Sequence, residues 1–173
     1  MSNPKPLILT PKPLTQQAFA PFGDVIEMDE DKSYLINQDM TRRYHKLATS
    51  DTDTQNGSSI ISIFKSKRWQ FPLQILMMEK HPLGSQAFLP MQGHNWLIVV
   101  ATGNVPTAQT CQAFIATGVQ GVQYNKGVWH HPLLTLAEQQ NFWIVDRDGA
   151  GENLIEHHFE GQTAQVDIRP VES

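Results

Sequence analysis

Four side chains in two short strings of the sequence are of types that bind metals or move protons. The string EKHPLGSQAF carries Glu79, His81 and Gln86, and the string GVWHHP carries His130. Imidazole titrates close to neutral pH and is a common metal ligand, so the histidines suit both acid–base catalysis and metal binding. Two imidazoles, a carboxylate and an amide oxygen could hold a borderline divalent ion such as Ni²⁺. The same residues could instead form a metal-free polar pocket that hydrogen-bonds a substrate.

The elements that must position these side chains have the pattern of short β-strands. From residue 58 onward, runs such as SIISIFKS, NWLIVVATG and NFWIVDRD are rich in β-branched and aromatic residues, and Gly, Pro, Asn or Asp separates most of them. Closely spaced strands without helical patterns between them predict an all-β sandwich or barrel. Upstream, Thr15 is the expected N-cap of a short helix within residues 15–27, and the polar segments 28–33 and 48–57 are predicted surface loops.

The two strings resemble degenerate forms of the two sequence motifs of the cupin superfamily. The first cupin motif has H-x-H, then a Glu after three or four residues, then a Gly six residues beyond. At that spacing this sequence has Glu79-x-His81, Gln86 and Gly93. The second motif ends in G-x-x-H, and GVWH places His130 at its histidine.

The cupin resemblance implies a fold as well as a site. The fold would be a cupin-like antiparallel β-barrel or jelly roll with short helical additions near the N-terminus, and such barrels bind ligands at the mouth. The resemblance also implies that Glu79, His81, Gln86 and His130 converge there as a metal-ligand set. Because adjacent side chains of a strand point to opposite faces, His130 should face the pocket and His131 the other side.

Longer strings together resemble the ureidoglycolate lyase family of allantoin degradation. RRYHKL, HPLGSQAF and VWHHPL, with Tyr124 upstream of the last, carry the resemblance, and strings such as AFAPFGDVIE and FWIVDRDG extend it over about nine-tenths of the chain. Lys80 and Asn125 depart from the residues usual in the family. The resemblance implies cleavage of (S)-ureidoglycolate into glyoxylate and urea, a homodimer, and nickel or another divalent metal without an organic cofactor.

The implied reaction needs a base for the substrate's hydroxyl proton and a proton donor for the departing nitrogen. His81 or His130 suits the base, because imidazole titrates near the working pH. Tyr124, six residues before His130, is the candidate donor to the leaving nitrogen. A metal at the same place could instead bind the hydroxyl and lower its pKa.

The substrate also carries a carboxylate and a urea group that must be held. Arg43 and Lys126 are the candidates for the carboxylate, and Arg is favoured because its planar fork matches a carboxylate at two points. Asn37 and Gln86 could bind the urea amide, because their side chains donate and accept in one plane.

Several other residues have plainer interpretations. Cys111, the only cysteine, has no CxxC companion and is expected to be a small core residue. The run of Glu and two His at 156–158 could look like a metal tract, but adjacent residues in an extended segment diverge, so solvated surface is expected there. Asp146 and Arg147 are open to two interpretations, a structural ion pair at a strand end or a functional pair.

Composition limits the classes of function. The chain has 173 residues, which predicts one domain over residues 1–173. A net charge of −4 and a pI near 5.9 give no basic surface for nucleic acid. The longest apolar run, WLIVVA, is far shorter than a membrane span, and the N-terminal segment is a poor signal peptide. One cysteine fits a reducing compartment, so a cytoplasmic protein is expected.

Two other functions fit part of the pattern. One is a non-catalytic cupin-type sensor that binds a small carboxylate, although the sequence has no DNA-binding segment beside the barrel. The other is a cupin isomerase or epimerase that acts on a different hydroxy acid. The missing H-x-H makes an ordinary cupin metalloenzyme the weaker alternative, and product analysis would separate the three.

Overall fold

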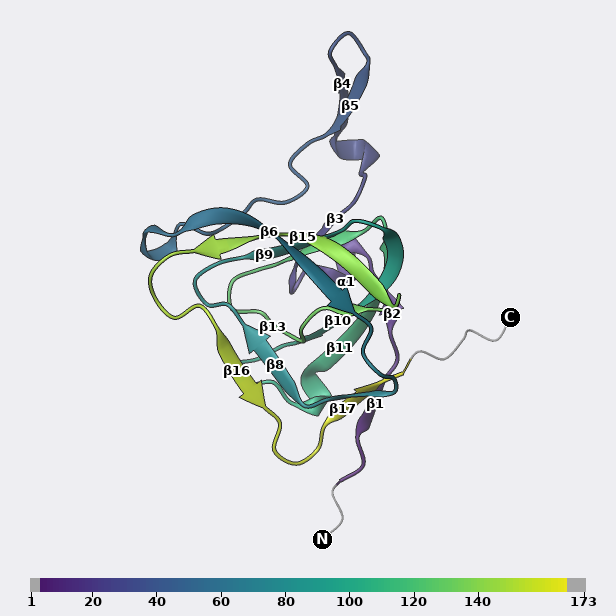
Figure 1. Cartoon of the computed structure of the whole chain (residues 1–173), viewed down its shortest axis with the longest axis vertical. Coiled ribbons are helices and arrows are strands. Elements are labelled where there is room, and N and C mark those ends of the chain that lie inside the picture. Colours follow the sequence, from purple (N-terminus) through teal and green to yellow (C-terminus); the bar gives the residue numbers. More distant parts are fainter. Residues whose placement is uncertain (1–3, 168–173) are drawn as a thin grey trace, which may run out of the picture.

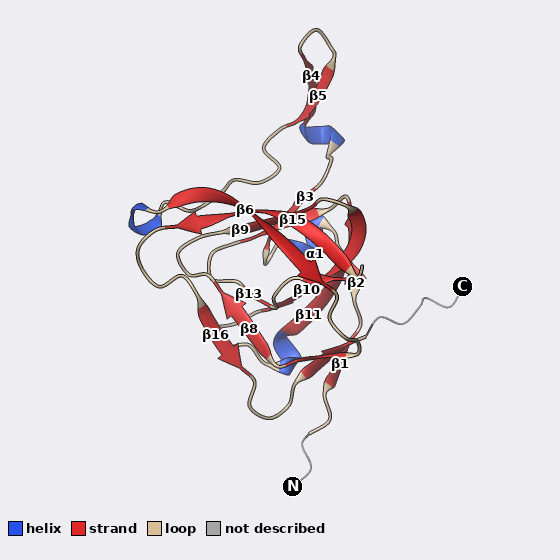
Figure 2. Ribbon diagram, in the orientation of Figure 1, coloured by secondary structure: helices blue, strands red, loops and turns tan. Residues whose placement is uncertain are grey.

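The computed structural model describes residues 4–167, and its regular structure is mostly β (Figures 1 and 2). Two mainly antiparallel sheets pack face to face and carry most of the strands. The larger sheet contains β16 (Ile155–His158), β8 (Met77–Lys80), β13 (Trp129–His130), β10 (Gly93–Ala101), β11 (Cys111–Gly118) and β2 (Lys12–Pro13) in that order, with β14 (Leu134–Thr135) also paired to β10. The smaller sheet has the order β3 (Gly23–Ile26), β12 (Gly121–Tyr124), β9 (Gln86–Pro90), β15 (Gln139–Asp148) and β6 (Ser58–Lys67).

A third, three-stranded sheet covers the outer face of the larger one. It has the order β1 (Leu7–Leu9), β17 (Ala164–Val166) and β7 (Leu73–Ile75). Strand β10 shows why both faces of the larger sheet must be covered, because its run of apolar residues alternates between two cores. Trp96 and Ile98 belong to the core between the two large sheets, whereas Leu97 and Val99 belong to the core under the third sheet.

The predicted all-β architecture is confirmed, but the two large sheets are not joined into a closed barrel. Within residues 4–167, no strand pairing joins the two large sheets, so they form an open sandwich whose edges include β6 and β16. Two pairings are parallel, β1 with β17 and β2 with β11. The open edge along β6 matters below, because it leaves the space between the sheets accessible from one side.

The helices are few and short. They are α1 (Gln16–Phe19) and the 3-10 turns η1 (Glu30–Lys32), η2 (Thr54–Asn56) and η3 (Ala108–Thr110). Thr15 is the N-cap of α1, as predicted, and its side chain accepts a hydrogen bond from the Ala18 amide. No helix within the described part of the chain is long and apolar enough to cross a membrane.

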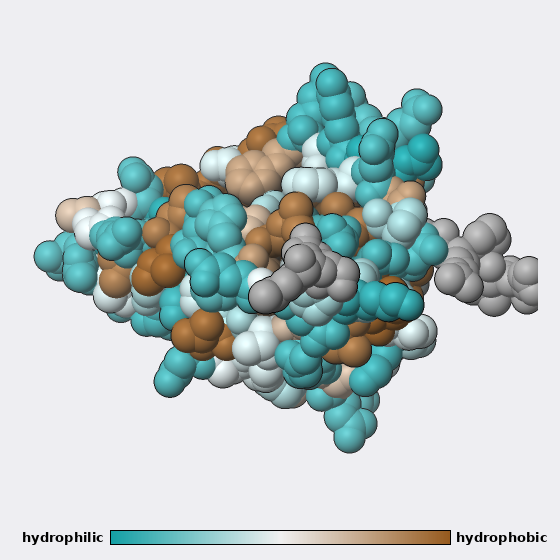
Figure 3. All heavy atoms as spheres, turned by 90° about the horizontal axis from the view of Figure 1, so that it is seen from below, coloured by the Kyte–Doolittle hydropathy of each residue, from teal (hydrophilic) through white to brown (hydrophobic). Residues whose placement is uncertain are grey.

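A hairpin that the sequence analysis did not predict projects from the body of the protein (Figure 1). Strands β4 (Ser33–Ile36) and β5 (Thr41–Tyr44) pair only with each other, and η1 lies at their base. The predicted loop at 28–33 is therefore partly wrong, because it includes η1 and the start of β4. The predicted loop at 48–57 is irregular apart from η2. At the opposite end of the molecule, hydrophobic side chains lie in separate patches between hydrophilic ones (Figure 3).

Candidate active site

Neighbouring strands of the larger sheet bring a carboxylate and two imidazoles together. Glu79 on β8 is the direct cross-strand partner of His130 on β13, and His81 follows the end of β8. The ligand atoms of the three residues all lie within 4.8 Å of one another, and Glu79 Oε1 is 3.4 Å from His130 Nε2. The rings of His81 and His130 are 5.2 Å apart. The predicted meeting of these three side chains is thus present between the sheets.

Backbone contacts set the tautomer of both histidines. The Nδ1 atom of His81 lies 2.7 Å from the Asn153 carbonyl oxygen, and that of His130 lies 3.1 Å from the Val128 carbonyl oxygen. A carbonyl oxygen can only accept, so each Nδ1 carries the proton and each Nε2 has a free lone pair. Both Nε2 atoms are buried without a hydrogen-bond partner. Unpaired buried polar atoms are costly, and lone pairs directed at a common point suit a metal ion or a substrate.

The electrostatics keep the cluster ready to bind a cation. Burial would raise the pKa of the Glu79 carboxyl, but its interaction with the His130 ring, 3.4 Å away, and with the nearby His81 and His131 outweighs burial, and the pKa is lowered. Burial and the neighbouring His130 lower the pKa of His81, which is therefore neutral at pH 7. A charged carboxylate beside a neutral imidazole is the protonation state that a divalent metal requires.

The facing sheet adds an amide and a second carboxylate. Gln86 on β9 donates from Nε2 to Asp146 Oδ2 on β15 at 3.1 Å. This bond fixes the amide orientation, and it leaves Gln86 Oε1 and Asp146 Oδ1 buried without partners. Sequence analysis assigned Gln86 to the site and left Asp146 open between a structural and a functional role, although strand alternation could have placed it on the inner face with Gln86.

Tyr124 holds one face of the His130 ring. Tyr124 on β12 is the cross-strand neighbour of Gln86, and its ring stacks on His130 at 4.3 Å with an interplanar angle of 8°. Burial raises the pKa of the Tyr124 hydroxyl far above its usual value, so this group stays protonated. The adjacent His131 packs instead against Trp69, at a ring distance of 5.2 Å, which fits the predicted divergence of the two histidines.

A cavity opens the cluster to solvent at the β6 edge. It has a volume of about 430 Å³, and its lining includes Glu79, Phe64 on β6, Phe88 on β9, Trp69 and Leu133. Apolar walls around a few polar groups are typical of a small-molecule site. A small molecule could reach Glu79 from this side, past Lys65 at the rim.

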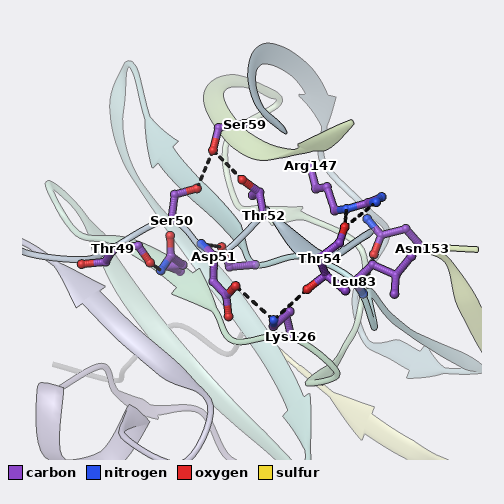
Figure 4. A network of polar contacts seen from close by, with 12 residues as sticks. Thr49, Ser50, Asp51, Thr52, Thr54, Ser59, Leu83, Lys126, Arg147 and Asn153 are labelled. Atoms are coloured by element: carbon purple, nitrogen blue, oxygen red, sulfur yellow. Dashed lines mark hydrogen bonds and ion pairs between the residues drawn. The ribbon is translucent and has the colours of Figure 1, made fainter. Parts of the chain in front are cut away.

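Three predicted substrate-binding residues are not brought to this cluster within the chain. Asn37 and Arg43 lie on the projecting hairpin, which pairs with no other strand. Lys126 forms an ion pair with Asp51 at 3.0 Å and donates to Thr54 Oγ1 at 3.0 Å (Figure 4). Of the predicted substrate-binding set, the cluster region contains Gln86.

The structural ion pair between Asp146 and Arg147 is not formed. Arg147 is buried and donates to the carbonyl oxygen of Thr54 (Figure 4) and to that of Ala150, on the side of β15 away from Asp146. It therefore fastens the loop around η2 to β15. Asn153 has a comparable role for His81: its carbonyl accepts from His81, and its side chain accepts from the Leu83 amide at 2.9 Å.

The remaining residues behave as expected. Cys111 is buried in the core under the third sheet, and burial raises its pKa to about 11. Glu156 and His158 are exposed on β16 and lie 3.7 Å apart, while His157 is half-buried. The 156–158 run is thus mostly solvated surface.

Comparisons with known proteins agree on one family. A family model described as ureidoglycolate lyase matches residues 6–167. A protein of Pseudomonas paraeruginosa named ureidoglycolate lyase is 52% identical over 149 residues, which is 86% of this chain and 88% of that protein. Proteins of the same name from Pseudomonas fluorescens and Pseudomonas syringae pathovar tomato are 51% and 49% identical, over 87% and 95% of this chain and 91% and 98% of their own lengths.

Proposed function

The chain belongs to the ureidoglycolate lyase family, and from this membership we propose that it cleaves (S)-ureidoglycolate into glyoxylate and urea at the cluster of Glu79, His81 and His130. The observation that carries the choice of site is the pair of buried, unpartnered Nε2 atoms beside the Glu79 carboxylate. The apolar-walled cavity that reaches Glu79 supports the same choice.

The reaction moves one proton and breaks one bond. Ureidoglycolate carries a hydroxyl, a ureido nitrogen and a carboxylate on the same carbon. When the hydroxyl loses its proton, the carbon–oxygen bond becomes a carbonyl, and the electron pair of the carbon–nitrogen bond leaves with the nitrogen. The nitrogen then takes up a proton to give urea, and no water is consumed. The site therefore needs a proton acceptor, a proton donor and a cation for the carboxylate.

The protonation states on the inner faces suit these roles. In the metal-free site, Nε2 of His81 or His130 accepts the hydroxyl proton, because each Nδ1 is occupied with a backbone carbonyl. The protonated Tyr124, stacked on His130, donates to the leaving nitrogen. An Nε2 atom cannot bind a metal and accept a proton at once, so in a metal-loaded site the free Oδ1 of Asp146 is the proposed acceptor. Gln86 binds the urea amide or completes the metal site.

The cluster also fits a divalent metal ion. The proposed ligands are Glu79, Nε2 of His81 and His130, and Oε1 of Gln86, whose orientation is held by Asp146. Mixed nitrogen and oxygen donors suit a borderline ion, and we propose nickel. A bound ion would supply Lewis-acid chemistry by lowering the pKa of the substrate hydroxyl.

We also propose that the protein is a cytoplasmic homodimer. Its only cysteine is buried and has no disulfide partner, which suits a reducing compartment. The exposed apolar side chains along the β6 edge, described below, support association with a second copy.

The activity test uses purified protein and racemic ureidoglycolate. Glyoxylate and urea should form in equal amounts from one enantiomer, at a rate well above spontaneous decomposition. His130→Ala and His81→Ala should each lower kcat by about 100-fold or more, whereas His158→Ala, at an exposed site, should not. If glyoxylate forms no faster than by spontaneous decomposition, whether or not Ni²⁺ is added, the proposal is refuted. Tight glyoxylate binding without turnover would support the sensor. A product other than glyoxylate and urea would support the isomerase or epimerase.

Elemental analysis tests the metal separately. Protein purified without a histidine tag should contain one divalent ion per chain, and His81→Ala and His130→Ala should abolish it. A variant that loses activity but keeps its metal would show that the substituted histidine acts on the substrate.

A further inference from the structure

The cluster lacks a positive charge for the substrate carboxylate. Within residues 4–167, no lysine or arginine forms an ion pair with Glu79 or Asp146. Lys126 is engaged with Asp51 and Thr54 (Figure 4). The charges that lower the pKa of Glu79 all belong to histidines. A lyase acting on a carboxylate, as proposed above, therefore needs either the proposed metal ion or a basic side chain from outside the cluster to hold that group.

Other nearby basic side chains do not point into the space between the two large sheets. Lys65 lines the rim of the cavity, but strand alternation places it on the outer face of β6 with Ile61 and Ile63, because Phe64 packs inward on Phe88. Arg147 donates to the Thr54 and Ala150 carbonyls. Lys80, next to Glu79 on β8, lies over the Trp129 ring at 4.4 Å, on the opposite face of the strand. Neither Lys80 nor Arg147 is available to a ligand between the two large sheets, so among residues 4–167 Lys65 at the rim is the only lysine or arginine that lines this cavity.

The projecting hairpin carries an arginine without a partner. Arg43 forms no ion pair or hydrogen bond with any other described residue, although Arg42 beside it bonds Ser33 Oγ at 3.0 Å. Arg43 is the cross-strand neighbour of Tyr34, so these two side chains share one face of the hairpin with Ile36 and Thr41. This face, defined by Tyr34, Ile36, Thr41 and Arg43, is called the arm face below.

The hairpin has the properties of an element that needs a partner. Tyr34 and Leu35 are each 45% exposed, and Met40 at the tip is 85% exposed. A lone two-stranded hairpin is at best marginally stable in water, and exposed apolar side chains on it indicate a missing packing surface. The body of the same chain does not supply that surface, because the hairpin extends away from it (Figure 1).

A matching apolar surface lies along the edge strand β6. Ile61 and Ile63 are 72% and 51% exposed on its outer face, next to Trp143 on β15. Phe64, on the opposite face of β6, is also exposed and lines the cavity that contains Glu79. An uncovered edge strand of ten residues is a surface for association. An element that crosses this edge passes directly into the mouth of the site.

Charge favours the same pairing. Glu79 lines the cavity and has Glu156 as its cross-strand partner on β16, while Lys65 lies at the rim. The arm carries Arg42 and the unpaired Arg43. The unpaired guanidinium of Arg43 is complementary in charge to the carboxylates of Glu79 and Glu156.

We propose that two copies of this chain pair so that the arm face of each packs across the β6 edge of the other, where Arg43 binds the carboxylate of the partner's substrate. The inference rests on the proposed lyase function for the role of Arg43, but not for the packing. The same patches meet twice around a two-fold axis, so the assembly closes as a dimer. Arg suits this position because its fork bonds a carboxylate at two points. Each site is then complete only when the second copy is present.

The packing is tested without any activity measurement. Sedimentation of the wild-type protein at micromolar concentration should give a dimer. Tyr34→Asp on the arm face and Ile63→Asp on β6 should each shift it to the monomer, whereas Val119→Asp, another exposed apolar residue outside both surfaces, should leave the dimer intact. A monomeric wild-type protein, or a Tyr34→Asp variant that remains fully dimeric, would overturn the proposal.

The role of Arg43 is tested by steady-state kinetics. Arg43→Gln should remain dimeric and lower kcat/KM about 10- to 100-fold, chiefly through KM, because a charge-assisted bond to the carboxylate is lost. Arg42→Gln is the matched control on the other face of the hairpin, and its kcat/KM should stay within about twofold of the wild type. Wild-type kinetics for Arg43→Gln would refute its assignment. If the wild-type protein lacks lyase activity, the proposed function fails and the sedimentation result still decides the packing.

A mixing experiment decides whether the arm acts on its own chain or on its partner. Arg43→Gln has an intact cluster, and His130→Ala has an intact arm. In a co-refolded equal mixture, half of the dimers are mixed and each of these has one site with both parts. With substrate well below KM, activity should therefore recover to about a quarter of the wild-type level, although each variant alone gives at most about a tenth of it. His81→Ala replaces His130→Ala if the latter does not fold. No recovery from two folded, dimeric variants would overturn the proposal.

Discussion

Replacing Gln86 by Glu tests the arrangement of the two facing sheets and the metal site together. In the wild-type protein, the Gln86 amide nitrogen donates to Asp146 Oδ2 at 3.1 Å, and the amide oxygen is buried and free. Gln86→Glu turns that donor into an acceptor and places two carboxylates against each other. The shape of the side chain is almost unchanged, so the effect is electrostatic.

The size of the effect follows from the contact. Losing a hydrogen bond to a charged group costs about 1.5–3 kcal/mol. Two full charges at the 3.1 Å separation of the present contact would repel by about 5 kcal/mol at an effective dielectric constant of about 20. One carboxyl avoids part of this by keeping its proton, so we expect the metal-free variant to be about 3–5 kcal/mol less stable at pH 8. Because this raises the pKa in the folded state above its unfolded value, the loss grows with rising pH and is smallest near pH 4.

Urea unfolding with EDTA at pH 8 and pH 5 measures this loss. Gln86→Met is the control, because it removes the hydrogen bond without adding a charge, and it should cost less than Gln86→Glu at pH 8. Calorimetry with Ni²⁺ should show at least about tenfold tighter binding to Gln86→Glu, since a charged oxygen is the stronger ligand. Equal stability of the two variants at pH 8 would refute the contact with Asp146, and unchanged or weaker Ni²⁺ binding would refute Gln86 as a ligand.

Three further predictions concern the rest of the molecule. Cys111 should react with a thiol reagent about a hundredfold more slowly in the folded protein at pH 8 than after unfolding, because burial raises its pKa to about 11; equal rates would show an accessible thiol. Gly84→Ala should destabilise the protein by about 1–3 kcal/mol in urea unfolding, because the new Cβ would lie 2.6 Å from Arg147 Cβ; an unchanged midpoint would mean that Arg147 can shift freely. Burial lowers the pKa of His81 and of His131, so below the usual histidine pKa of about 6.5 the unfolded chain binds protons that the folded chain excludes. The free energy of unfolding of the metal-free protein should therefore fall between pH 7 and pH 5, and a flat profile would contradict the burial of these rings.

The sequence predicted those strands and helix ends whose formation depends on residues close together in the chain. β-branched runs separated by turn residues predicted the strands, and Thr15 predicted the N-cap of α1, because alternation and capping involve residues close in the chain. The hairpin at β4 and β5 was missed, since its strands have no buried face and so no alternating apolar pattern. The dimer proposed above would explain its exposure.

The sequence predicted the chemical type of the site but not all of the residues that form it. Motif spacing pointed to Glu79, His81 and His130, and strand alternation gave the direction of His130. The sequence could not assign Asp146, because its contact with Gln86 joins strands 60 residues apart and depends on how β9 and β15 pair. Nor could it show that Lys126 is engaged by Asp51.

The amino-acid sequence by itself determined the residue types available for chemistry, the all-β character and the family. Only the tertiary structure decided which of these side chains share a space, which nitrogen of each histidine is free, and that Arg43 lies far outside the body of its own chain. The physical reason is that strand composition is a local property, whereas a site depends on cross-strand register and on buried hydrogen bonds between segments far apart in the chain.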